Sequence, residues 1–242
     1  MRYFIYLSYD GTPFHGWQVQ PNANSVEAEI EKALSIILRH NLEIVGAGRT
    51  DTGVHARQMV AHFDYNYDVL TPKLKYSLNR ILPKSIAIND IKSVDEGLHA
   101  RFSAKWRTYC YYIHTKKDPF NDAYSLEMHY DLNFPLMNEA ASHLLIVSDF
   151  SAFCKSNTDV ATTICNVVEA KWIQDGVTDW HFVITSNRFL RNMVRAIVGT
   201  LIDVGRKKIS ITEFDNIVSG KNRSAAGESM PAKALFLEKI IY

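Results

Sequence analysis

The 242-residue sequence contains only three cysteines, Cys110, Cys154 and Cys165, and none of them forms a CxxC pair. An odd number of cysteines with this spacing argues against a disulfide framework and against a zinc ribbon. Proline is also scarce, with 7 residues, while 47% of the chain is hydrophobic. This composition is typical of an ordinary globular protein and excludes a disordered one.

Long apolar runs and an excess of charge of one sign are also missing. No segment approaches the roughly 20 apolar residues that a membrane span needs, and the N-terminal stretch 1–11 lacks the cleavage site of a signal peptide. We therefore expect a cytoplasmic protein. The net charge is +1, so a nucleic-acid partner would have to be bound by local basic patches.

Signatures of metal and nucleotide binding are absent as well. The nine histidines include no HxH or HxxxH pair with a carboxylate at ligand spacing. The glycine-rich segment 46–53 lacks the Lys-Ser/Thr that completes a phosphate-binding loop. We therefore expect neither a metal nor another cofactor.

Hydrophobic periodicity predicts strands and helices in both halves of the chain. The expected strands are 2–9, 42–46, 58–65, 85–94, 105–115, 162–174, 177–186 and 235–242, and the expected helices are 24–40, 71–83, 136–147, 188–205 and 212–219. Asn24 and Thr71 are the predicted N-caps of the first two helices. The pattern favours an α+β fold of two similar halves, 1–98 and 99–242, each a mostly antiparallel sheet backed by helices.

One glycine-punctuated loop, GAGRTDTGVHA (46–56), is dense in ionisable groups. Asp51 in such a loop is usually a turn residue that bonds its own backbone. Arg49, two residues earlier, favours a site instead, because a neighbouring cation keeps a carboxylate ionised, as a nucleophile or general base requires. His55 is interpreted as a structural, hydrogen-bonding residue.

Arginines recur at helical spacing within the predicted helix 188–205, at Arg188, Arg191 and Arg195. The first two fit a solvated helix face. Arg195 lies among apolar residues, where a guanidinium needs a carboxylate partner because a lone buried charge is costly. Asp51 is one candidate, although no feature of the sequence pairs the two.

Basic and aromatic side chains are interleaved in ARFSAKWRTYCYYIH (100–114). On a strand, one face would carry Arg101, Lys105, Arg107, Tyr109 and Tyr111. Such a face offers phosphate contacts and stacking platforms for unpaired RNA bases. An amphipathic edge strand with its tyrosines on the core side explains the pattern equally well.

Six motifs that together span nearly the whole chain can be recognised. They are YDGTPFHGWQ (9–18), GRTDTGVHA (48–56), HARFSAKWRTYCY (99–111), SDFSAF (148–153), FLRNMVRAIVGTLIDVG (189–205) and MPAKALFLEKIIY (230–242). In this order they resemble the motifs of the tRNA pseudouridine synthase A family. The resemblance implies isomerisation of uridine to pseudouridine in the tRNA anticodon stem-loop, usually at positions thirty-eight to forty, without a cofactor.

The resemblance also implies roles for individual residues. Asp51 matches the nucleophile, Arg49 the arginine of the same motif, and Tyr109 the tyrosine that contacts the target base. Arg195 matches the arginine that pairs with the catalytic aspartate. The family fold is a pseudo-two-fold pair of α/β sheet domains with a central cleft, usually in a homodimer.

Three positions depart from the family pattern. Met59 stands where many members have glutamine, Ala234 replaces a frequent glycine, and Thr108 replaces a frequently basic residue. These positions bear on local packing or tRNA contacts.

Without the resemblance, a non-catalytic RNA-binding or RNA-chaperone protein is the alternative, because it would share the basic strand but would not need Asp51. A glycosidase would require a second positioned carboxylate.

Overall fold

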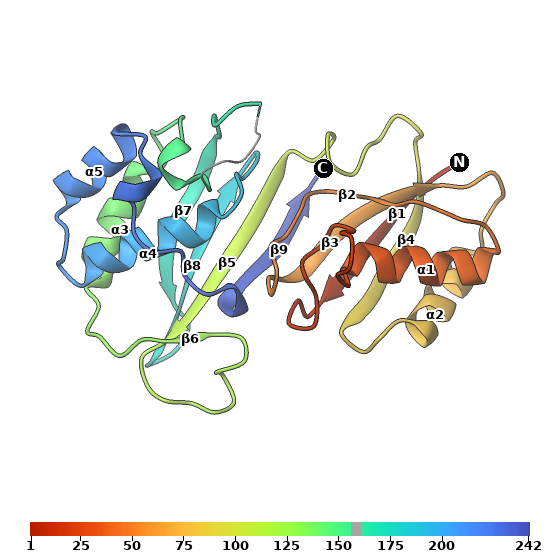
Figure 1. Cartoon of the computed structure of the whole chain (residues 1–242), viewed down its shortest axis with the longest axis horizontal. Helices are drawn as coiled ribbons and strands as arrows, with labels where there is room; N and C mark the ends of the chain where they lie inside the picture. The colour runs from red at the N-terminus through yellow and green to blue at the C-terminus, as the bar shows by residue number, and fades with distance from the viewer. Residues whose placement is uncertain (156–160) are drawn as a thin grey trace. The chain divides into compact units, whose positions relative to one another are not determined.

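The computed structural model describes residues 1–155 and 161–242, which form nine strands and five α-helices (Figure 1). They fall into two compact units. Met1–Lys105 and Phe236–Tyr242 make the first unit, and Trp106–Leu235 makes the second. Of the strand pairs described below, most are antiparallel and two are parallel. The predicted α+β class is confirmed.

The first unit is a sheet with two helices. Its elements are β1 (Arg2–Tyr9), α1 (Val26–Leu38), β2 (Val45–Gly46), β3 (His55–Asp64), α2 (Thr71–Ile81), β4 (Ile86–Val94) and β9 (Leu235–Ile241). β1 lies between β3 and β4 and is antiparallel to both, whereas β9 runs parallel to β3. The helices contact each other and bury apolar residues at helical spacing, such as Ile30 and Leu34 on α1. Both ends of the chain therefore contribute to this sheet.

The second unit repeats the combination of sheet and helices. Its elements are β5 (Trp106–His114), β6 (Leu126–Glu127), α3 (Phe134–His143), β7 (Val167–Gln174), β8 (Asp179–Ser186), α4 (Met193–Gly205) and α5 (Ile211–Ser219). β8 is antiparallel to both β5 and β7, and β6 is parallel to β5. α4 is almost entirely buried and contacts α3. No helix in the described part of the chain is long and apolar enough to cross a membrane.

The prediction of a helix over 188–205 is wrong at its N-terminal end. α4 begins at Met193, after Asn192 in a left-handed conformation with φ 66°. Arg188 and Arg191 therefore lie outside the helix, and the predicted helical stripe of arginines does not exist. The apolar pattern continues through residues 189–190, but the backbone at Asn192 starts the helix later.

The two predicted N-caps are also wrong. Ser25 caps α1, because its hydroxyl accepts a hydrogen bond from the Ala28 N–H at 3.2 Å. The Asn24 side chain instead donates to the Pro13 carbonyl and bonds the His15 ring. Thr71 is the first residue of α2, which has no side-chain cap.

The interleaved segment 100–114 is only partly a strand. β5 starts at Trp106, so Arg101 and Lys105 precede it. Tyr111 is fully buried, and its hydroxyl donates to the Pro231 carbonyl at 3.0 Å. Tyr111 is therefore a core residue and offers no surface for an RNA base.

Candidate active site

Asp51 lies in a tight turn immediately before β3. The Val54 N–H donates to the Asp51 carbonyl at 3.1 Å, and Gly53 adopts a φ of 76°, which favours glycine. β3 begins at His55, three residues earlier than the sequence predicts. The backbone of the half-buried Asp51 is thus held in a turn at the start of β3, which lies between β1 and β9 in the sheet.

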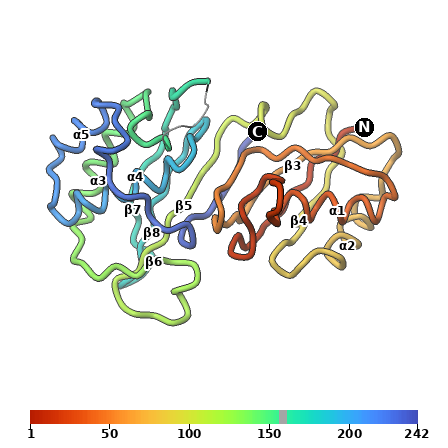
Figure 2. The backbone as a smooth tube through the Cα atoms, in the orientation of Figure 1, coloured from red at the N-terminus to blue at the C-terminus, as the bar shows by residue number. Residues whose placement is uncertain are grey.

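The loop between β1 and α1 holds this turn (Figure 2). The Trp17 N–H donates to the Thr50 carbonyl at 3.2 Å, and the Gly53 N–H donates to the Phe14 carbonyl at 3.4 Å. A third bond runs from the Gly11 N–H to Nδ1 of His55 at 3.0 Å. The sequence motifs 9–18 and 48–56 are therefore joined by hydrogen bonds in the folded chain.

Two glycines of the 9–18 loop allow this close approach. A Cβ on Gly11 would lie 2.1 Å from the Val54 carbonyl oxygen, and one on Gly16 would lie 2.4 Å from that of Thr50. Gly16 also has a φ of 92°. Sequence reasoning concentrated on the glycines at 46–53 and missed the function of these two.

Buried polar side chains complete the support of the turn. The hydroxyls of Tyr9 and Thr50 lie 2.8 Å apart, and both residues are buried. His55 is fully buried, with Nδ1 3.1 Å from Oδ1 of Asp10 and its ring stacked on Phe236 at 4.5 Å. The prediction that His55 is a structural residue is confirmed, whereas the Tyr9–Thr50 contact carries no signal in the sequence.

Arg49 is exposed on the same loop and acts electrostatically on Glu27 of α1. Burial raises the pKa of Glu27, while hydrogen bonds from Val19 and Trp17 and the charge of Arg49 oppose this shift. Glu27 accepts from the Trp17 indole at 3.1 Å and from the Val19 N–H at 2.9 Å. The negative charge of Glu27 therefore attracts the exposed guanidinium of Arg49.

Tyr109 lies on β5 of the second unit, opposite Ile184 of β8. It is half-buried, and its ring meets Phe189 edge to face at 5.0 Å and 81°. The neighbouring Thr108 hydroxyl lies 2.9 Å from that of Thr185. Thr108, which replaces a frequently basic residue of the family, thus has Thr185 as a hydrogen-bonding partner.

Arg195 lies on α4 of the second unit and is fixed at two points by Met230. Its Nε donates to the Met230 carbonyl, and its own carbonyl accepts from the Met230 N–H at 3.2 Å. Sequence reasoning sought a carboxylate and missed this carbonyl. Arg49 and Asp51 belong to the first unit and Tyr109 and Arg195 to the second, so the pairing of Asp51 with Arg195 stays a prediction.

The other two departures are accommodated by packing. Met59 is fully buried in β3, and the adjacent Gln58 accepts a hydrogen bond from the Ile240 N–H of β9 at 3.2 Å. Ala234 is fully buried in a short 3-10 helix before β9. Gln58 thus ties β3 to β9 beside the buried methionine.

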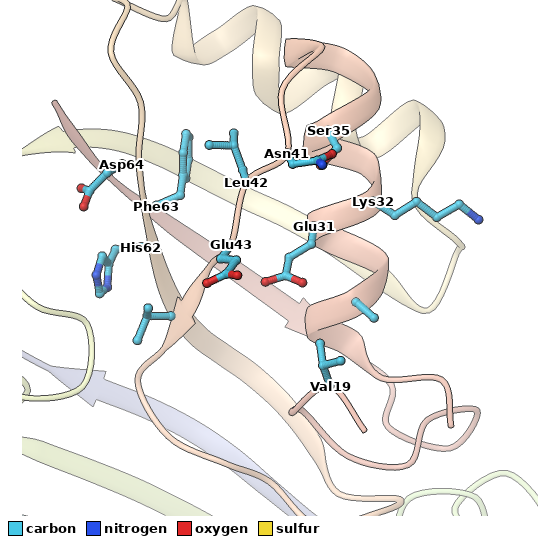
Figure 3. A pocket seen from close by; sticks show the side chains of 12 residues that line it. Val19, Glu31, Lys32, Ser35, Asn41, Leu42, Glu43, His62, Phe63 and Asp64 are labelled. Atoms are coloured by element: carbon cyan, nitrogen blue, oxygen red, sulfur yellow. The ribbon is translucent and has the colours of Figure 1, made fainter. Parts of the chain in front are cut away.

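A groove of about 730 Å³ lies between α1, the segment 41–45 and the end of β3 (Figure 3). Its lining includes neither Arg49 nor Asp51. Glu31, Glu43 and Asp64 outnumber the single cation Lys32, so the groove disfavours phosphate. Outside residues 156–160, no three His, Cys, Asp or Glu side chains gather as possible metal ligands.

A single carboxylate on a clamped turn beside an exposed arginine suits covalent or acid–base chemistry on a polyanion. Residues 140–242 match a family model described as tRNA pseudouridine synthase, a class of RNA isomerases. This match begins at residue 140, after β5, so it does not include Tyr109.

Relatives extend the match over the whole chain. The sequence is 52% identical to the tRNA pseudouridine synthase A of Bacteroides fragilis over 242 residues, which cover all of this chain and 96% of the relative. It is 40% identical to the protein of the same name from Bacillus subtilis over 248 residues, covering all of this chain and 99% of the relative. The chain belongs to the tRNA pseudouridine synthase A family, as its motifs predicted.

Proposed function

We propose that this protein isomerises uridine to pseudouridine at positions thirty-eight, thirty-nine and forty in the anticodon stem-loop of tRNA, with Asp51 as its nucleophile. The relatives are named tRNA pseudouridine synthase A and match over the full chain. The observation that carries the proposal for Asp51 is the clamped turn, since a nucleophile must be held in a fixed position.

The reaction breaks the bond from C1′ to N1 and forms a bond from C1′ to C5 of the same base. A proton leaves C5 and N1 gains one, so no oxidant, reductant or water is consumed. Asp51 either attacks C6, attacks C1′, or assists loss of the 2′-proton to give a glycal. All three routes require an ionised carboxylate at a fixed place.

The target base lies within a stem and has to be flipped out before it reacts. In this proposal Arg49 fills the vacated stack or binds the displaced phosphate, and its exposed position two residues before Asp51 supports that role. On the family resemblance, Tyr109 contacts the flipped base and Arg195 pairs with Asp51. The same resemblance supports a homodimer.

The test uses unmodified tRNA labelled with tritium at C5 of uridine. Isomerisation releases this hydrogen to water and leaves the RNA chain intact. Tritium release without strand breaks at abasic sites is expected. Binding without release would identify a non-catalytic RNA-binding protein, and abasic sites would identify a glycosidase, so either result would refute the proposal.

A further inference from the structure

A tight turn at residues 99–103, between β4 and β5, is closed by its own polar groups. The Ser103 N–H donates to the His99 carbonyl at 2.9 Å, and the Ser103 hydroxyl accepts from the His99 N–H at 2.9 Å. Nδ1 of His99 accepts from the N–H groups of Arg101 and Phe102 at 3.1 and 3.3 Å. An imidazole nitrogen that accepts two bonds is unprotonated, so His99 is neutral here.

The turn is also fastened to the sheet of the first unit. The Ala100 N–H donates to Nδ1 of His62 on β3 at 3.2 Å, and the Ala100 carbonyl accepts from the Tyr242 hydroxyl at 2.7 Å. Arg2 of β1 donates to the Leu98 carbonyl at 2.8 Å. Figure 1 marks the C-terminus beside this connection. The backbone at 98–100 is therefore bonded to β1, to β3 and to the residue that follows β9.

This rigid turn presents an aromatic ring to solvent. Phe102 is 76% exposed, although its ring lies 4.4 Å from the His99 ring. The Arg101 guanidinium lies 5.7 Å from the Phe102 ring centre. Lys105 is exposed, and its N–H is bonded to the Ile241 carbonyl at 2.7 Å. An exposed ring beside one guanidinium, with a second exposed cation three residues further along the chain, is a combination that binds unpaired nucleotides.

The turn lies far from Asp51 within the same unit. β3 passes from His55, next to the Asp51 turn, to His62, which holds Ala100. Seven strand residues at about 3.3 Å each separate these points by about 23 Å. A nucleotide at Phe102 therefore cannot be the nucleotide that reacts at Asp51.

We propose that Phe102 stacks on an unpaired or splayed base of the tRNA substrate while Arg101 and Lys105 contact the flanking phosphates. This inference rests on the proposed function. We infer that this contact is made equally in the ground state and the transition state, in which case it strengthens tRNA binding and leaves kcat unchanged. A second protein surface is less suited to this turn, since burying two cations would require matching carboxylates.

The experiment compares Phe102→Leu with Phe102→Tyr. Leucine keeps an apolar side chain but removes the π-face, whereas tyrosine keeps the ring. Binding of unmodified tRNA is measured at fixed salt, together with tritium release at saturating tRNA. We expect Phe102→Leu to weaken binding roughly 5- to 160-fold, as loss of one base stack does. Phe102→Tyr should bind within about two-fold of wild type, and neither change should alter the saturated rate.

A matched control is Phe120→Leu, at a 90% exposed phenylalanine whose N–H bonds the Asp118 carboxylate at 2.9 Å. It should bind tRNA as the wild type does. Arg101→Ala and Lys105→Ala should each reduce the slope of log affinity against log salt by about one.

Unchanged tRNA binding by Phe102→Leu would overturn the inference. The inference would also be overturned if Phe102→Leu differed from the wild type in the mass measured by light scattering but not in tRNA affinity. In that case the turn would bind a second copy of the chain. Failure of the proposed function looks different: the wild-type protein itself would release no tritium.

Discussion

Removal of the Tyr9 hydroxyl tests whether the buried contact beside Asp51 stabilises the turn. The hydroxyls of Tyr9 and Thr50 lie 2.8 Å apart, at residues that are 4% and 8% exposed. Tyr9→Phe takes this bond from a buried Thr50 hydroxyl, which costs about 1–3 kcal/mol. Each kcal/mol lowers the Tm of a chain of this size by about 2–4 °C. We therefore expect a loss of roughly 2–12 °C.

Thr50→Val and the double variant complete a cycle. Each single change breaks the same hydrogen bond, so the double variant should lose less stability than the sum of the two, by about 0.5–3 kcal/mol. Thr50→Ser is the matched control, because it keeps the hydroxyl. Thr50 directly precedes Asp51, so Thr50→Val should lower kcat more than it changes KM, and serine should restore kcat.

Urea unfolding and the tritium assay measure the two effects on the same preparations. Strictly additive losses in the cycle would show that the two hydroxyls do not interact. A stability loss in Thr50→Val with wild-type kcat would show that the contact is structural and does not position Asp51.

Other positions give further expectations. Gly199→Ala should destabilise the protein by about 1–3 kcal/mol in urea unfolding, because its Cβ would lie 1.9 Å from the Glu228 carbonyl oxygen, whereas Gly48→Ala, with no atom within 4 Å, should not. Burial lowers the pKa of His62 to about 4. The unfolded imidazole therefore binds its proton at higher pH than the folded one, and the His62 contribution to stability is full above pH 6.5 and lost as the pH falls toward 4. His62→Asn should flatten that part of the stability curve, and an unaltered curve would contradict this. Tyr109→Leu should abolish single-turnover pseudouridine formation if the ring stacks on the base. Tyr109→Phe should also be slow only if the hydroxyl transfers a proton, and wild-type rates in both would remove Tyr109 from the site.

Local patterns predicted the elements of the fold better than their long-range pairing. The apolar spacing within 24–40 was enough to predict a helix there, of which residues 26–38 form α1, and aromatic and β-branched residues were enough to predict β1. The return of β9 to pair in parallel with β3, with His55 opposite Phe236, joins residues far apart in the chain. No window of a few residues contains that information.

The candidate site shows the same division. Glycines and charges around Asp51 mark the loop, because they are consecutive in the sequence. The hydroxyl contact of Tyr9 with Thr50 and the bonds of Arg195 to Met230 arise only when distant segments meet. The prediction of a helical stripe of arginines was wrong for a local reason. Asn192 adopts a left-handed conformation, and the apolar pattern of the sequence does not reveal it.

The most direct test of the central claim is the Asp51→Asn variant assayed with unmodified tRNA tritiated at C5 of uridine. The amide keeps the size of the side chain but cannot act as a nucleophile or base. We predict no tritium release above background, with tRNA affinity within a few-fold of wild type. Sustained turnover by the purified variant, with deamidation excluded by mass spectrometry, would contradict the assignment of Asp51 as the nucleophile.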